Sequence, residues 1–136
     1  MVRGVWSEVG KLEKGLVHRP GSEIDRLTPS NREELLFDDI LWLEKAHEDH
    51  DTFSATLASQ GAQVVYLQDL LAETLDLAPG RTWLLEQTID DRHFGVALSE
   101  PLREYLAAQA SKQLAQILIS GLTRAEIEAE LGAVAS

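Results

Sequence analysis

Two histidines that lie three residues apart in an acidic run form the pattern in this chain closest to a metal site. His47 and His50 are separated by Glu48 and Asp49 and followed by Asp51. Side chains at this spacing share one face of a helix, and imidazole and carboxylate groups bind zinc. The helical zinc-protease pattern, however, needs histidines four residues apart, and no third ligand stands out. The alternative, which predicts no bound metal, places both histidines at the border between the apolar and polar faces of a helix.

Three carboxylates are candidates for contact with a cationic group. Asp38 and Asp39 follow an apolar run, and adjacent carboxylates are rarely buried together without a cation or hydrogen-bond donors. One interpretation is that they hold a guanidinium or ammonium group. The other is that they occupy the start of a helix, where the helix dipole favours acids. Glu8 lies between Trp6 and Val9, where it faces either an active site or the solvated edge of a sheet.

Several common catalytic and cofactor-binding patterns are missing from the sequence. The chain has no cysteine, and therefore no disulfide, thiolate metal ligand or cysteine nucleophile. It shows no nucleophile elbow and no glycine loop of the kind that binds phosphates or dinucleotides. No cofactor is predicted.

Length and charge restrict the class of protein. A chain of 136 residues with 44% hydrophobic residues predicts one folded domain. The net charge is −11, and the acidic excess falls in residues 37–136. This charge argues against nucleic-acid and anionic-membrane partners, both of which need clustered cations. No apolar run reaches the roughly 20 residues that span a bilayer and no secretory signal is visible, so we expect a cytoplasmic protein.

The first half of the chain predicts a mixture of strands and one long helix. Apolar runs at 5–9 and 12–18, separated by a glycine, predict a β-hairpin. Thr28, which precedes a proline, and Asn31, with an acid three residues later, are candidate helix caps. Apolar residues then recur at helical spacing from Ile40 until a glycine at position 61. A further strand at 64–67 gives the strand, helix, strand order of an α/β unit.

The second half predicts helices only. Residues 68–132 carry leucines at helical spacing, with Ser99 as a candidate cap and Thr123 to Glu126 as a capping box. We therefore divide the chain into an α/β segment, 1–67, and a helical bundle, 68–136. The tryptophans are expected to anchor the core or an interface: Trp6, Trp42 and Trp83.

Four runs in the first 39 residues resemble the start of one enzyme family. They are Ser7-Glu8-Val9-Gly10-Lys11-Leu12, Leu16-Val17-His18-Arg19-Pro20-Gly21, Leu27-Thr28-Pro29 and Glu34-Leu35-Leu36-Phe37-Asp38-Asp39. In this order they resemble the amino-terminal part of arginine deiminases, and weaker similarity continues to residues 121–123.

The resemblance implies a fold and a reaction. The fold is the amino-terminal part of a five-fold pseudo-symmetric α/β propeller, with an inserted helical bundle that makes this chain mostly helical. The reaction is hydrolysis of L-arginine to L-citrulline and ammonia through a thiouronium intermediate on a cysteine. In the family, the nucleophilic cysteine, the general-acid histidine and the catalytic aspartates lie beyond the helical insertion, so we expect no catalytic residue in this chain.

The resemblance also places three substrate-binding residues here. Leu36 matches a residue that lines the substrate pocket, Glu8 matches a carboxylate close to the catalytic cysteine, and Asp39 matches a more variable acid. The family's usual Gly-Val-His-Ser-Glu has Trp6 in place of its histidine, which changes the surroundings of Glu8.

Two functional hypotheses follow. The chain is either an amino-terminal segment of an arginine deiminase or a stand-alone acidic interaction module derived from a truncated one. In the first case it would contribute substrate pocket and helical cover, be inactive alone, and bind L-arginine only together with the remaining propeller segments. Under either hypothesis, open strand edges allow a homo-oligomer.

Overall fold

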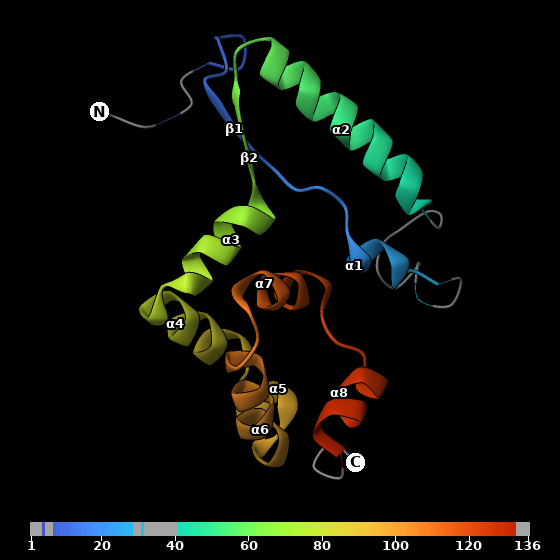
Figure 1. The fold of residues 1–136 in the computed structure, drawn as a ribbon, viewed down its shortest axis with the longest axis vertical. Coiled ribbons are helices and arrows are strands. Elements are labelled where there is room, and N and C mark those ends of the chain that lie inside the picture. Colours follow the sequence, from blue (N-terminus) through green and yellow to red (C-terminus); the bar gives the residue numbers. More distant parts are fainter. Residues whose placement is uncertain (1–3, 5–6, 29–30, 32–40, 133–136) are drawn as a thin grey trace.

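The computed structural model of the chain describes residues 4, 7–28, 31 and 41–132. Over these ranges the chain is mostly helical and contains one two-stranded sheet (Figure 1). The strands and the long helix lie at one end of the molecule, and the later helices lie at the other (Figure 1). The expected partial α/β character and the high helix content are therefore both found, and the propeller remains a prediction.

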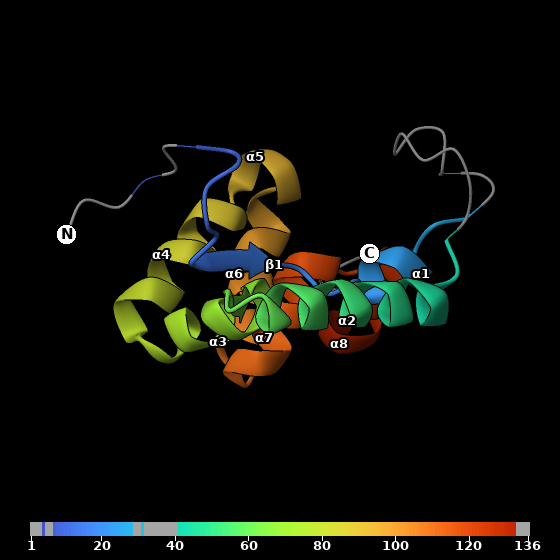
Figure 2. The same cartoon turned by 90° about the horizontal axis from the view of Figure 1, so that it is seen from above.

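The sheet is a parallel pair joined through a helix. Strands β1 (Lys14–Val17) and β2 (Gln63–Tyr66) pair in parallel from Lys14 opposite Gln63 to Val17 opposite Tyr66. Parallel neighbours need a long crossover connection, and that connection contains α2 (Leu43–Ser59), which packs against β2 and lies alongside the strands in Figure 2. This arrangement confirms the predicted strand, helix, strand unit.

The predicted hairpin between residues 5–9 and 12–18 is wrong. The described part of its first arm, residues 7–10, is not a strand, and Val9 is almost fully exposed. β1 pairs with β2 instead, and the amide of Gln63 extends the ladder by donating to the carbonyl of Glu13 at 2.8 Å. Val64 and Val65 give β1 an apolar partner strand, which the polar residues at 7–8 do not offer.

Helix α2 ends as the sequence predicts. Gln60 is its C-cap, and Gly61 has a φ of +84°, a conformation that glycine adopts without the steric cost of a Cβ. Its most buried side chain is Ser54, whereas Phe53 is exposed, so the inward face differs slightly from the predicted apolar stripe. The predicted start at Ile40 lies outside the described residues.

The remaining helices form a bundle around a leucine-rich core. A short helix, α1 (Ser22–Asp25), precedes α2. The helices after β2 are α3 (Leu67–Asp76), α4 (Ala78–Thr88), α5 (Asp91–Phe94), α6 (Val96–Ala107), α7 (Ser111–Ser120) and α8 (Arg124–Leu131). The buried core consists of Ala72, Leu75, Leu85, Ile89, Leu102, Leu106, Leu114 and Ala115. Burying each leucine contributes roughly 1.5–3 kcal/mol, so this core is the main apolar contribution in the described part of the chain.

The two predicted caps in the bundle have different outcomes. The capping box at Thr123 and Glu126 is present in full at the start of α8. Ser99, in contrast, is not a cap but a buried residue inside α6, where its single hydroxyl hydrogen lies within reach of two acceptors, the Asp91 carboxylate and the Gly95 carbonyl, the latter at 2.9 Å from Oγ. Helix α6 starts earlier than predicted because Gly95, with a φ of +76°, lets the chain turn directly from α5 into α6.

Arg81 joins three parts of the bundle. Its guanidinium donates to the carbonyls of Leu75, Ala107 and Gln109 at 2.7 to 2.9 Å and to the Ser111 hydroxyl at 2.7 Å. These groups belong to the end of α3, the end of α6 and the turn into α7. One side chain therefore satisfies carbonyls that the helix ends leave unpaired.

In the described residues, the tryptophans are not part of the hydrophobic core. Trp42 and Trp83 are 68% and 60% exposed, and Trp6 lies outside the described residues. The expectation of core packing is wrong for Trp42 and Trp83, and a role at an interface remains a prediction for both. In the described residues, none of the helices has the length and apolar character needed to cross a membrane.

Candidate functional site

The loop that follows β1 is fixed by hydrogen bonds from the side chains of two helices. His47 of α2 lies with its Nε2 2.8 Å from the carbonyl oxygen of Pro20, and Gln68 of α3 donates its Nε2 hydrogen to the carbonyl of Arg19 at 2.6 Å. Carbonyl oxygens only accept, so both nitrogens must carry the hydrogen. The backbone of the His18-Arg19-Pro20-Gly21 loop is thus fixed between the strand unit and the bundle.

Arg19 points its side chain to α2. Its guanidinium makes a two-bond contact with Asp51, at 2.8 and 3.0 Å. The hydrogen bonds from Arg19 are the main reason that the pKa of Asp51 lies below its ordinary value. Both side chains are well exposed, so water and salt screen the pair, and its main effect is to fix the orientation of the arginine.

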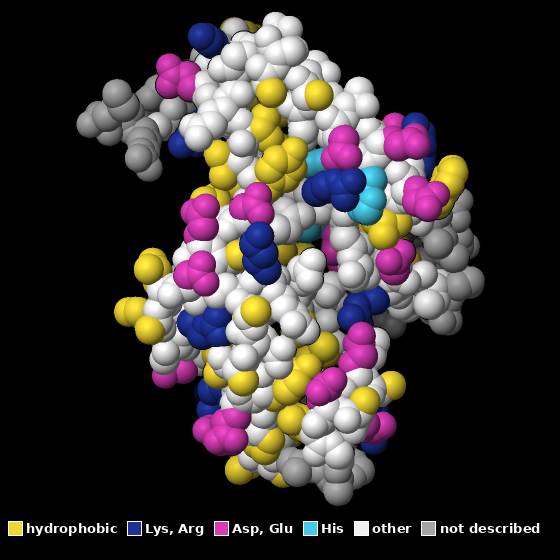
Figure 3. All heavy atoms as spheres, in the orientation of Figure 1, with side chains coloured by type: hydrophobic (Ala, Val, Ile, Leu, Met, Phe, Trp, Pro, Cys, Tyr) yellow, Lys and Arg dark blue, Asp and Glu magenta, His cyan; other side chains and the backbone are white. Residues whose placement is uncertain are grey.

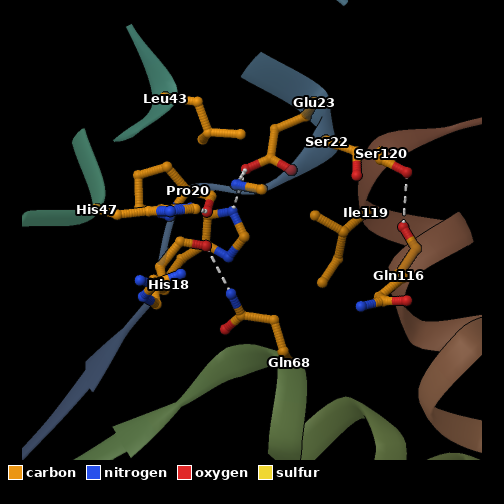
Figure 4. A pocket seen from close by; sticks show the side chains of 12 residues that line it. His18, Pro20, Ser22, Glu23, Leu43, His47, Gln68, Gln116, Ile119 and Ser120 are labelled. Carbon is orange, nitrogen blue, oxygen red and sulfur yellow. Dashed lines mark hydrogen bonds and ion pairs between the residues drawn. The ribbon is translucent and has the colours of Figure 1, made fainter. Parts of the chain in front are cut away.

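A pocket of about 300 Å³ opens beside this loop (Figure 4). Its walls come from the β1–α1 loop, from the first turns of α1, α2 and α3, and from the last turn of α7. In Figure 3, histidine side chains lie next to a basic side chain in the upper half of the molecule. The lining residues are His18, Arg19, Pro20, Gly21, Ser22, Glu23, Leu43, His47, Gln68, Gln116, Ile119 and Ser120.

Glu23 supplies the negative charge in the pocket. Its Oε1 lies 2.7 Å from the Gly21 amide nitrogen and 2.8 Å from Nε2 of His18. Burial opposes ionisation of this carboxyl, but hydrogen bonds from the backbone of Glu23 itself, from His18 and from the Gly21 amide outweigh it, so the pKa of Glu23 is lowered. Glu23 is therefore ionised at neutral pH.

The pocket wall also contains acceptors without donors. When the ring of His18 is neutral and its Nε2 donates to Glu23, Nδ1 is an acceptor, and it is buried without a partner among the described residues. With Nε2 of Gln68 donating to Arg19, Oε1 of Gln68 is likewise a buried acceptor without a partner in these parts of the chain. A buried polar atom that lacks its hydrogen bond costs about 1–3 kcal/mol. These two atoms therefore mark a part of the pocket wall where hydrogen-bond acceptors lack donors.

The predicted substrate-binding residues are not brought together in the described structure. Glu8 is exposed in a bend before β1, not in a strand, and it does not line the pocket. Leu36 and Asp39, as well as Asp38, lie outside the described residues. The assignment of Glu8, Leu36 and Asp39 to a substrate pocket therefore stays a prediction.

His47 and His50 face different partners. His47 contacts Pro20, whereas Nδ1 of His50 lies 3.5 Å from the Ser54 hydroxyl and its ring packs near Tyr66, with centroids 6.1 Å apart. Among the described residues, no group of three or more His, Cys, Asp or Glu side chains is placed to hold a metal ion. Both rings make contacts within the fold.

Sequence reasoning missed the residues that form the pocket. His18 belongs to a run that indicated the family but no site. Apart from its position five residues after His18, nothing near Glu23 in the sequence indicates that it lines a pocket. Gln68 lies 49 residues after Arg19 in the sequence, and its side chain contacts the Arg19 carbonyl only in the folded chain. A histidine directly after a strand and before Arg-Pro-Gly is a signal that could have indicated this loop.

A model of one protein family matches most of the chain. A family model described as arginine deiminase matches residues 33–133, which is most of the chain. The chain belongs to the arginine deiminase family. The matched range contains α2, β2 and the helical bundle, whereas the loop at His18 and the run from Ser7 to Gly21 lie before it.

Proposed function

We propose that this chain is the amino-terminal segment of an arginine deiminase, which hydrolyses L-arginine to L-citrulline and ammonia. The observation that carries the proposal is the family match over residues 33–133. In the complete enzyme, the segment would provide one α/β unit of a propeller, part of the substrate pocket through Glu8, Leu36 and Asp39, and a helical cover. L-arginine and the remaining propeller segments would be its partners.

The two-stranded sheet supports this proposal. Isolated pairs of strands are marginal, and sheets are usually larger. Within the described residues, β1 and β2 pair only with each other, and Leu16 on β1 is 61% exposed. A sheet with two open edges and an exposed leucine is suited to pairing with further strands.

The segment should be inactive alone. Deiminase chemistry of the family's type needs a thiolate to attack the guanidinium carbon, and this sequence has no cysteine. Incubating the purified 136-residue chain with L-arginine should yield no citrulline. Adding a separately produced remainder of the enzyme should restore turnover, and turnover by the chain alone would overturn the proposal.

The alternative is an acidic interaction module derived from a truncated deiminase. Exposed Trp42 and Trp83 together with a net charge of −11 favour it, because aromatic side chains are common in protein interfaces. Sequencing the gene beyond Ser136 separates the two functions. A continuation with a late cysteine supports the enzyme segment, whereas a stop codon with no neighbouring frame for the remainder supports the module.

A further inference from the structure

We propose that the pocket between the His18–Gly21 loop and α7 binds a small organic cation that carries an ammonium or guanidinium group. The proposal uses only contacts of described residues and does not depend on the proposed deiminase function. It assigns a ligand to a pocket in which Glu8 takes no part.

The first argument is the kind of hydrogen-bonding group that the pocket leaves without a partner. The hydrogen bonds that the Glu23 carboxylate accepts from His18 and from the Gly21 amide both end on Oε1. Among the described residues, Nδ1 of His18 and Oε1 of Gln68 are buried without hydrogen-bond partners. These two atoms, when the histidine is neutral, and the Glu23 carboxylate are all acceptors, so the complementary ligand is rich in N–H donors. Ammonium has three such donors and guanidinium has five.

The second argument is charge. Glu23 is ionised, and Ile119 and Ser120, the last two residues of α7, line the same pocket. The C-terminal end of a helix carries a partial negative charge that favours cations. The guanidinium of Arg19, the fixed positive charge in the wall, is already paired with Asp51. The pocket therefore favours a positive ligand over a neutral one of the same shape.

The third argument is size and wall composition. A pocket of about 300 Å³ lies at the lower end of the range for small-molecule sites. Leu43 and Ile119 give it apolar sides against which the carbon part of such a ligand can pack (Figure 4). The described residues offer no cluster of ligands for a metal ion, which leaves an organic cation as the better match.

The ligand would act on the loop as well as fill the pocket. Nδ1 of His18 and Oε1 of Gln68 are closed to water, so a donor reaches them only if the side chain of Gln68 or His18 rotates slightly. Gln68 also holds the carbonyl of Arg19. Occupation of the pocket should therefore be visible in the backbone amides of Gly21 and Glu23.

The test compares two probes of nearly equal shape, methylguanidinium and neutral methylurea. Each is titrated into the 15N-labelled 136-residue chain while amide chemical shifts are recorded. We expect methylguanidinium to shift the amides of Gly21 and Glu23 in a saturable way, and methylurea to bind at least about tenfold more weakly, since hydrogen bonds to charged groups are the stronger ones. Equal binding of both probes, or saturable shifts only outside the pocket, would overturn the proposal.

A pair of variants adds a second, independent readout. Glu23→Gln should weaken methylguanidinium binding at least about tenfold, whereas Asp25→Asn, with the same charge change on the same short helix, should leave it unchanged. Asp25 is exposed and does not line the pocket. An equal loss in both variants would show a general charge effect and contradict the site. If circular dichroism shows that Glu23→Gln is unfolded, the comparison of the two probes decides alone.

Discussion

The bundle and the strand unit of this molecule are each stabilised internally by a different kind of interaction. The bundle, α3 to α8, buries eight hydrophobic residues in one cluster, including Leu75 and Leu114. In the strand unit, β1, α2 and β2, the most buried residue is a polar one, Ser54. The strand unit is connected to the bundle by, among other contacts, the hydrogen bond from Gln68 of α3 to the carbonyl of Arg19 in the loop after β1. The bundle therefore relies on apolar burial and the strand unit on hydrogen bonds and half-buried contacts.

This difference indicates which part depends on something outside the described residues. A leucine core of this kind can support a bundle by itself, but two parallel strands with an exposed Leu16 lack a comparable core. The strand unit should accordingly open at lower free energy than the bundle, as regions with few buried apolar contacts do. This comparison also agrees with the proposal that further propeller segments pack against the strands.

The largest effect is expected from removing the most buried leucine. Leu114 is 0% exposed, so Leu114→Ala should lower the free energy of unfolding by about 2–5 kcal/mol through lost burial and the cavity left behind. Leu16→Ala, at 61% exposure in β1, should cost less than about 0.5 kcal/mol, as surface changes usually do. Urea unfolding followed by circular dichroism measures both. Similar losses for the two variants would contradict the contrast between the regions.

The next largest effect should come from Arg81. Arg81→Met leaves the carbonyls of Leu75, Ala107 and Gln109 without their charged donor, and we expect a loss of about 2–3 kcal/mol in the same unfolding assay. Arg124→Met is the matched control, because Arg124 is exposed and its ion pair within the described residues is with Glu128 on its own helix. A small effect of Arg81→Met would mean that water replaces these hydrogen bonds at little cost.

A smaller, local effect is expected at the joint between the two regions. Gln68→Ala removes the hydrogen bond to the Arg19 carbonyl and should lower the opening free energy of the β1 amides by about 1 kcal/mol. The amides of α6 should be unaffected, because their protection comes from the bundle core. Native-state hydrogen exchange measures both sets, with Gln87→Ala on the exposed face of α4 as control. An equal change in β1 and α6 would show that the two regions open as one unit.

Features set by neighbouring residues could be predicted from the sequence, and those set by distant ones could not. The end of α2 at Gly61 and the capping box at Thr123 need only local geometry. The hairpin was wrong because the pairing of Lys14 with Gln63 is decided by residues far along the chain. Ser99 was misread as a cap because Gly95, four residues earlier, sets the true start of α6.

The candidate site was hidden for the same reason. His18 and Glu23 are close in sequence, but their function as a pocket depends on Gln68 and on the end of α7, which tertiary packing brings to them. The residues that the family resemblance indicated, such as Glu8, lie elsewhere or outside the described ranges. Motifs identified the family, whereas the pocket required the structure.

The smallest effect is expected in the acid range and concerns the bundle's last helix. Backbone and side-chain hydrogen bonds from Thr123, together with Arg26, lower the pKa of Glu126 from 4.5 to about 2. A carboxyl with a depressed pKa in the folded state adds stability above its ordinary pKa and loses it as the pH falls through the folded value. The free energy of unfolding should therefore decline between pH 4.5 and about 2 partly because Glu126 becomes protonated.

Glu126→Gln tests this assignment, because the amide oxygen can still accept from Thr123 but carries no charge that titrates. Urea unfolding across this pH range should give a shallower decline for Glu126→Gln than for the unmodified chain, while Glu130→Gln on the same exposed stretch of α8 should leave the slope closer to the original. The Arg26 contacts at 3.1 and 3.2 Å tie α8 to the segment after α1. A parallel decline for Glu126→Gln and the unmodified chain would show that the titration of Glu126 does not contribute to the acid sensitivity of the fold.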